Sequence, residues 1–168
     1  GYRSSAQVPE YLSLFGLDAF EYQCGRGVRV NEEMAKHLRE NAEKYGIALS
    51  LHAPYYISLS SVEEEKRKKS VDYIVQSARA ARLIGADRIT VHSGSCGKIP
   101  REKALDLAKD TLKKAILVLD DLGFGDLHLC PETMGKVNQL GTLEEVMELC
   151  SLDERLFPCI DFGHLNAR

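Results

Sequence analysis

The feature that most constrains the fold is a regular alternation between short apolar runs and longer helical stripes. Five runs of five or six residues are rich in apolar side chains and end at a polar residue or a turn-former. They are Ala19–Cys24, Ile47–His52, Arg88–His92, Leu127–Glu132 and Phe157–Asp161. Because their starts lie roughly 28 to 40 residues apart, the rhythm of parallel βα units, the sequence predicts an α/β protein.

Between these runs the apolar spacing becomes helical. Asn31 is the predicted cap of one helix, and Ser61 with Glu64 three residues later predicts another capped helix. The remaining signals are a stripe from Leu105 to Leu119, the capping pair Thr142 and Glu145, and the stop glycines Gly46, Gly85 and Gly123. The predicted order is therefore an alternation of helices and strands that begins with a helix and ends with the fifth strand.

Side-chain parity decides between the two architectures that share this rhythm. No strand is followed by a glycine-rich phosphate-binding turn, which disfavours a doubly wound open sheet. In Ile47–His52 the small or polar side chains of Ala48, Ser50 and His52 share one face, and the other face is apolar. The other strands repeat this division. We therefore predict a (β/α)8 TIM barrel, with the apolar faces under the helices.

The predicted barrel is incomplete. A complete barrel takes about 250 residues and eight strands, whereas this chain has 168 residues and five predicted strands. Its first residues already have helical spacing, with Val8, Leu12 and Phe15 three to four residues apart. We expect one domain over residues 1–168 that contains strands two to six, with strands one, seven and eight absent.

Composition excludes several classes of protein. No apolar run approaches the roughly 20 residues that cross a bilayer, and no secretory signal is visible, so we expect a cytoplasmic protein without a membrane partner. The five cysteines are odd in number and include no C-x-x-C pair, which argues against a disulfide framework and against a cysteine zinc site. The net charge of −3 does not favour generic nucleic-acid binding.

Four predicted strands end in a side chain that can bind a metal. These are His52, His92, Glu132 and Asp161, and His164 follows the last by three residues. Alone, each histidine could be a hydrogen-bonded structural residue, and each carboxylate could be a helix cap or a salt-bridge partner. In register at the carboxyl ends of a barrel, where active sites of this fold lie, the set predicts a site for zinc, manganese or iron.

The strand-end motifs resemble those of a known family. His52-Ala53-Pro54-Tyr55, Val91-His92-Ser93-Gly94, Pro131-Glu132-Thr133 with Gly135, and Asp161-x-x-His164 are similar, in order and spacing, to motifs of the endonuclease IV family. That family comprises zinc-dependent enzymes that cut DNA at abasic sites, among the xylose-isomerase-like barrels. The second motif usually has proline where this chain has Ser93, and the third usually has asparagine where it has Thr133.

The resemblance implies roles for five residues. His52 and His92 would hold one zinc, Glu132 would be the catalytic carboxylate that bridges it to a second zinc, Asp161 would bind the second, and His164 a third. The cofactor would be zinc, up to three ions in the complete protein, or manganese, and the partner would be double-stranded DNA with an abasic site. Because the other ligands would come from absent strands, we expect the isolated chain to be inactive and to self-associate through its open sheet edges.

The resemblance also implies DNA contacts by Tyr55, Tyr56 and Arg26. The tyrosines follow His52 closely and could wedge into a duplex opened at a missing base. The alternative is that one tyrosine packs on the next helix. Arg26 stands where the family has a groove-inserting loop, and an exposed turn arginine is the alternative.

Two other functions are compatible with the pattern. A sugar isomerase or epimerase of the same barrel class would use Glu132 and Asp161 with a later histidine and glutamate around one cation. That class does not normally need the pair His52 and His92, which favours the nuclease. A catalytically silent barrel remnant that serves as a binding module is the third hypothesis, supported by the low strand count.

Overall fold

Four of the five predicted strands form one parallel sheet in their sequence order. The computed structural model describes residues 3–168. Its strands are β1 (Ala19–Gln23), β2 (Ala48–His52), β3 (Arg88–Val91) and β4 (His128–Pro131), each hydrogen-bonded to the next. The register pairs Gln23 with His52 and His52 with Thr90. The strand ends that carry polar side chains therefore meet along one edge of the sheet.

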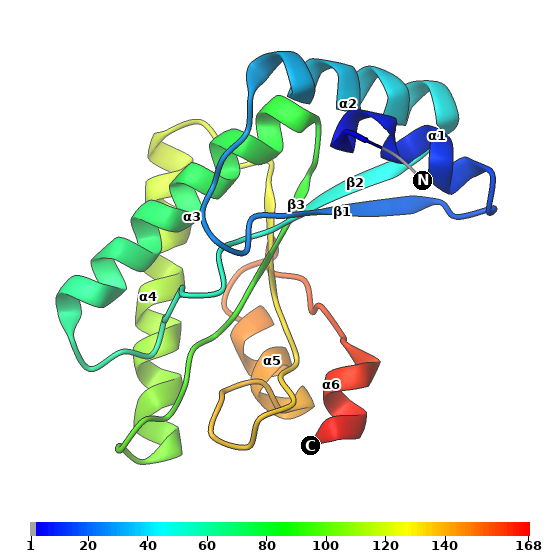
Figure 1. The fold of residues 1–168 in the computed structure, drawn as a ribbon. Coiled ribbons are helices and arrows are strands. Elements are labelled where there is room, and N and C mark those ends of the chain that lie inside the picture. The colour runs from blue at the N-terminus through cyan, green and yellow to red at the C-terminus, as the bar shows by residue number, and fades with distance from the viewer. Residues whose placement is uncertain (1–2) are drawn as a thin grey trace.

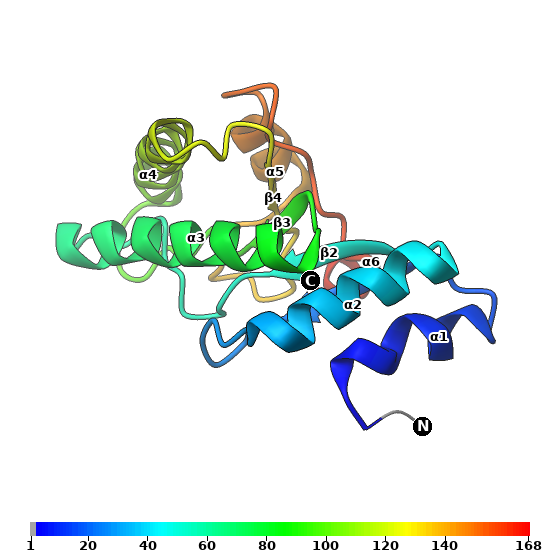
Figure 2. The same ribbon diagram turned by 90° about the horizontal axis from the view of Figure 1, so that it is seen from above.

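All of the helices except the last lie on one side of the sheet, and the last one lies near the carboxyl ends of the strands (Figures 1 and 2). Their bounds are α1 (Val8–Ser13), α2 (Glu32–Tyr45), α3 (Glu64–Ile84), α4 (Arg101–Asp121), α5 (Leu143–Cys150) and α6 (Phe162–Ala167), with a 3-10 turn at Ser5–Gln7. None of the described helices is both long and apolar enough to span a membrane.

The fifth predicted strand is not a regular strand. Leu156 and Cys159 instead form isolated parallel bridges with Leu129 and Glu132. The segment runs beside β4, since the Cys159 amide donates to the Pro131 carbonyl at 2.9 Å. Pro131 of β4 has no N–H that could donate to the Phe157 carbonyl between the two bridges, which explains the interruption.

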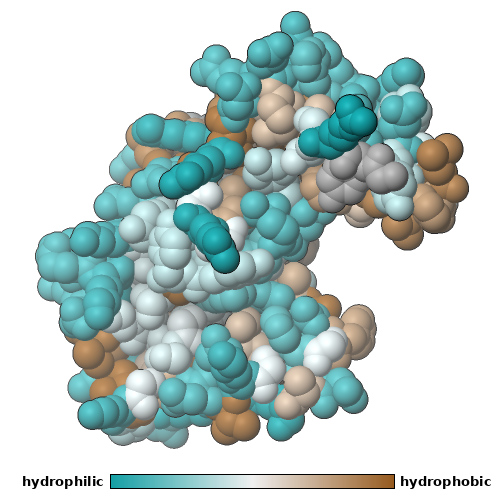
Figure 3. Space-filling model, viewed as in Figure 1, coloured by the Kyte–Doolittle hydropathy of each residue, from teal (hydrophilic) through white to brown (hydrophobic). Residues whose placement is uncertain are grey.

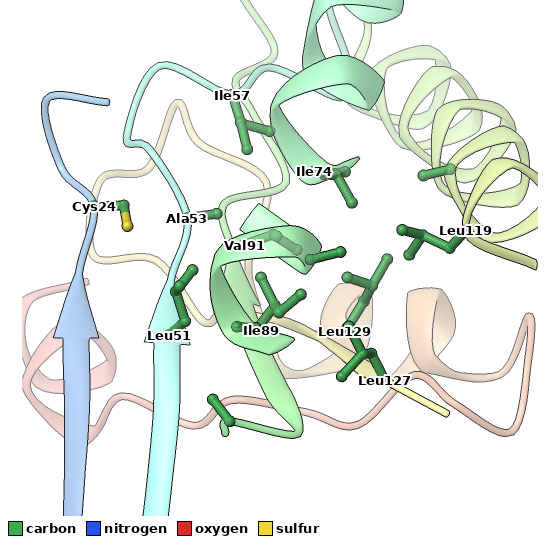
Figure 4. Close-up of a cluster of buried hydrophobic side chains, with 14 of the residues drawn as sticks. Cys24, Leu51, Ala53, Ile57, Ile74, Ile89, Val91, Leu119, Leu127 and Leu129 are labelled. Carbon is green, nitrogen blue, oxygen red and sulfur yellow. The ribbon is translucent and has the colours of Figure 1, made fainter. Parts of the chain in front are cut away.

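The core lies between the sheet and its helices, as strand parity predicts. Leu51, Ile89 and Leu129 point from successive strands into this layer and are almost fully buried (Figure 4). They meet helix side chains such as Ile74 and Leu119, which belong to the same buried cluster. The opposite face of the sheet carries the polar set. In the space-filling view the molecule is hollowed between the part with α1, α2 and β1 and the part with α5 and α6 (Figure 3).

Most of the predicted helix boundaries are confirmed. Asn31 caps α2, Thr142 and Glu145 form a capping box on α5, and Gly46 ends α2 in the left-handed conformation. The predicted cap at Ser61 is wrong. Helix α3 begins at Glu64 after Glu63, and the Ser61 hydroxyl accepts only from the Glu63 amide, at 3.2 Å, because it stands too far before the first turn.

Candidate metal centre

Three strand ends bring His52, His92 and Glu132 together. The Nε2 atoms of His52 and His92 lie 3.4 and 3.0 Å from the Oε2 atom of Glu132. Each residue offers a ligand atom, and the three atoms lie within 4.8 Å of one another. Parallel pairing explains the convergence, because β2, β3 and β4 are neighbours and each side chain stands at or directly after its strand's carboxyl end.

Glu132 belongs to a second group as well. Its other carboxylate oxygen, Oε1, lies 3.5 Å from Nδ1 of His164, and Glu132, Asp161 and His164 again offer ligand atoms within 4.8 Å of one another. The two oxygens of one carboxylate thus face two different sets of donors. Glu132 is only 5% exposed, and within residues 3–168 its ion-pair partners are the three histidines and no lysine or arginine.

The surroundings of Glu132 keep it ionised. Burial alone would raise its pKa, but hydrogen bonds from His52 and His92 outweigh that effect and lower the pKa to about 2. Burial likewise opposes protonation of His52, while the hydrogen bond to Glu132 and the contact with the Ala53 carbonyl raise its pKa overall. A permanently charged carboxylate among imidazoles suits a divalent cation, whose charge would replace the protons.

Backbone contacts orient the donors. Nδ1 of His52 lies 2.7 Å from the Ala53 carbonyl, which can only accept, so this nitrogen donates and Nε2 is the nitrogen that could bind a cation. Nδ1 of His164 lies 2.9 Å from the Thr133 carbonyl. Asp161 caps α6, since its Oδ1 accepts from the His164 amide at 2.8 Å, and its own amide donates to the Thr133 hydroxyl at 2.8 Å. The second group is thereby fixed to the loop after β4.

A cavity of about 660 Å³ opens above these donors. Among the residues described, its lining includes all five predicted metal ligands and a single lysine, Lys136, together with Gln139 from the same loop. It also includes Glu21 and Gln23, which the sequence analysis missed. Both lie on the inner face of β1, and the alternation used for the other four strands would have identified them.

Of the three residues predicted to contact DNA, one lines the cavity and two do not. Tyr55 lines the cavity, stacks on His92 with ring centroids 5.5 Å apart, and donates to the Oε1 atom of Gln23 at 2.9 Å. Tyr56 instead meets Tyr73 of α3 edge to face, as the packing alternative predicted for one tyrosine. Arg26 is exposed and is not among the residues that line the cavity.

Comparison with protein families and curated proteins gives consistent results. The model of the family described as "Xylose isomerase-like TIM barrel" matches residues 9–168. An uncharacterised protein of Methanocaldococcus jannaschii is 34% identical over 159 residues, which cover 95% of this chain and 56% of that protein. A probable endonuclease 4 of Sulfurihydrogenibium sp. is 28% identical, over 83% of this chain and 50% of the relative. The chain thus spans about half the length of these relatives.

Solved structures show the same fold. Endonuclease IV from Thermus thermophilus matches with a TM-score of 0.76 and 24% identity, over 99% of this chain and 61% of that one. A D-tagatose 3-epimerase-like protein matches with the same TM-score and identity, over 94% and 61%. The predicted fold class, an incomplete α/β barrel, and the resemblance to the endonuclease IV family are both confirmed. The chain belongs to the xylose isomerase-like TIM barrel family.

Proposed function

We propose that this chain, as part of a complete barrel, carries the centre of a metal-dependent endonuclease that hydrolyses the phosphodiester 5′ to an abasic site in duplex DNA. One observation supports this most: the two carboxylate oxygens of Glu132 face two different donor groups. Such a carboxylate suits a site with two neighbouring cations, the arrangement found in many phosphoryl-transfer enzymes. Relatives named probable endonuclease 4 support the same activity.

The donor chemistry fits zinc. His52, His92 and Glu132 would hold one ion through two imidazole nitrogens and a carboxylate oxygen, and Asp161 and His164 would contribute to further sites, with manganese as the alternative metal. When bound, such ions supply a water of lowered pKa and stabilise negative charge on the phosphate. Ligands from further strands would complete the second group.

The chain's own residues position the reacting groups. The Ala53 and Thr133 carbonyls orient His52 and His164, and the histidine pair keeps Glu132 ionised. Lys136 is the only lysine of the described cavity lining, which contains no arginine, and it would attract a backbone phosphate. Tyr55 forms a half-exposed aromatic wall beside His92, suited to contact with an exposed sugar or base.

The test is cleavage of a duplex with one abasic site by the complete polypeptide. We expect zinc-dependent cleavage that is abolished by a chelator, and an intact duplex that is not cut. The variant Glu132→Gln should lose activity by several orders of magnitude, since it removes the charge shared by both groups. The matched variant Glu148→Gln changes a surface glutamate paired with Lys109 and should retain activity.

A sugar epimerase is the second candidate, because a solved D-psicose 3-epimerase matches this fold as well as the nuclease does. It would need Glu132 and Asp161 around one cation. Metal-dependent exchange of a ketose carbon-bound hydrogen with solvent, without cleavage of abasic DNA, would favour this reaction. A barrel that shows neither activity yet binds a partner would instead support a non-catalytic module.

A further inference from the structure

Two loops that begin at the metal ligands are joined to each other beside the cavity. The β3–α4 loop covers residues 92–100, and the β4–α5 loop covers residues 132–142 (Figure 1). Ser95 and Gln139 form an antiparallel bridge, the Cys96 amide donates to the Asn138 carbonyl at 2.8 Å, and the Leu140 amide donates to the Gly94 carbonyl at 3.0 Å. The loop that presents Lys136 and Gln139 to the cavity is therefore paired with the β3–α4 loop at residues 138–140.

One arginine holds this pair of loops from the outside. Arg101, the first residue of α4, donates through Nη1 to the Val137 carbonyl and through Nη2 to the Gln139 carbonyl, both at 2.8 Å. Its Nη1 also lies 3.5 Å from the Cys96 sulfur, so it contacts both loops. A planar guanidinium can make these contacts at once because its donors have a fixed fork geometry.

A buried carboxylate fixes the arginine in turn. Glu145 of α5 accepts from Nε and Nη2 of Arg101, the latter at 2.8 Å. The same carboxylate accepts from the Gly141 and Thr142 amides at 2.8 and 2.9 Å, which closes the β4–α5 loop at its far end. Glu145 thus connects the arginine, the end of the loop and the first turn of α5.

We infer that Arg101 is a positioning residue that acts through Lys136 and Gln139, by holding the cavity wall in the geometry that binds substrate. The inference rests on the proposed function, and it names a loop whose ordered geometry would give the nuclease part of its affinity for substrate. Glu132 and His92 are held by strand pairing, since the Glu132 amide donates to the Val91 carbonyl at 3.1 Å. We call the contacts of Arg101 with Glu145 and with the Val137 and Gln139 carbonyls the Arg101 clamp. Loss of this clamp should therefore affect substrate binding more than metal binding or the chemical step.

The test uses Arg101→Met and Arg101→Lys in the complete protein. Arg101→Met should speed hydrogen exchange in residues 94–97 and 136–142 and leave the strands unchanged. Because the loop must then be ordered on binding, KM for the abasic duplex should rise roughly five- to tenfold, with kcat and zinc content within about twofold. Arg101→Lys can pair with Glu145 but cannot reach both carbonyls, and should show most of the KM increase.

Arg155→Met is the matched control. Arg155 also pairs with two carboxylates, Asp120 and Asp153, and contacts the Gly125 carbonyl, but it touches neither loop. It should lower the melting temperature without raising KM. Unchanged hydrogen exchange of the two loops in Arg101→Met would overturn the inference. So would an equal increase of KM in Arg101→Met and in the control Arg155→Met. If the unaltered protein cuts no abasic DNA while loop exchange still rises in Arg101→Met, the proposed function fails and the clamp stands.

Discussion

At the scale of single residues, the contact between Gly25 and Tyr55 shapes the wall of the candidate metal centre. A Cβ atom at Gly25 would lie 2.5 Å from Cε2 of Tyr55, closer than side chains pack. The ring that stacks on His92 therefore depends on a glycine in the preceding loop. Nothing in the local sequence indicates this contact, because it joins the loops after two different strands.

We expect Gly25→Ala to displace the Tyr55 ring from His92. Tyr55 is half-exposed and can rotate away, so the free energy of unfolding should change by less than about 1 kcal/mol. The measurement is the NMR shift of the His92 ring protons, which senses the stacked tyrosine. In a Tyr55→Ala background the glycine substitution should have no further effect on that shift, and an equal shift in both backgrounds would contradict the prediction.

The second residue-scale prediction concerns the paired histidines. We expect His92→Ala to lower zinc affinity at least tenfold, since it removes one of the three donors in the first group. Competition with a chromophoric chelator measures this affinity. His37→Ala, on the exposed surface of α2, is the control and should bind zinc like the unaltered protein. Equal affinities in both variants would remove His92 from the set of ligands.

At the scale of elements, helix α2 offers a clean test of capping. The Asn31 side chain accepts from the Met34 amide at 3.1 Å, whereas Ser61 caps no helix amide of α3. Asn31→Ala should cost about 1 kcal/mol of unfolding free energy, and Ser61→Ala less than about 0.5 kcal/mol. Urea denaturation measures both. A loss at Ser61 as large as that at Asn31 would mean that its contact with Glu63 stabilises the helix after all.

The hydrogen bonds of the Glu145 carboxylate in the Arg101 clamp should make the free energy of unfolding depend on pH. Burial alone would raise the pKa of Glu145, but the Arg101 hydrogen bond and the loop amides lower it below its ordinary value of 4.5. A depressed pKa stabilises the fold above the unfolded pKa, and this stabilisation is lost as the pH falls through the folded pKa. Glu145→Gln should therefore cost about 2 kcal/mol at pH 7, and the difference from the unaltered protein should shrink below pH 4.5 in urea titrations.

The elements were predictable where the signal is local, and the departures have tertiary causes. Strand parity and stop glycines such as Gly46 depend only on neighbouring residues, so β1 to β4 and the helices α1 to α5 appear near the expected places, whereas the short helix α6 was not predicted. The segment at Leu156 and Cys159 depends on pairing with β4, which Pro131 interrupts because it has no N–H to donate. Side-chain parity and the parallel order of the strands together predicted that the candidate metal ligands would converge. The Arg101 clamp was not predictable, because it joins residues far apart in the chain.

At the scale of the whole molecule, the sheet has an unpaired edge at β1, and apolar side chains such as Phe157 and Phe162 are exposed. Unpaired edges and apolar surface promote association. We expect the isolated 168-residue chain to form oligomers at micromolar concentration in analytical ultracentrifugation. A longer polypeptide that supplies the remaining strands should be less associated, and a strictly monomeric 168-residue chain would contradict this expectation.

The origin of the candidate metal ligands from separate βα units has a consequence for how such a protein can change over evolutionary time. His52, His92 and Glu132 stand at or directly after the ends of three different strands, and only Asp161 and His164 share a segment. A substitution in one loop can therefore remove or replace one ligand while the packed layer of strands and helices stays the same. This modularity offers a physical reason why nuclease and epimerase barrels of similar shape could descend from one ancestor by exchanging ligands one loop at a time.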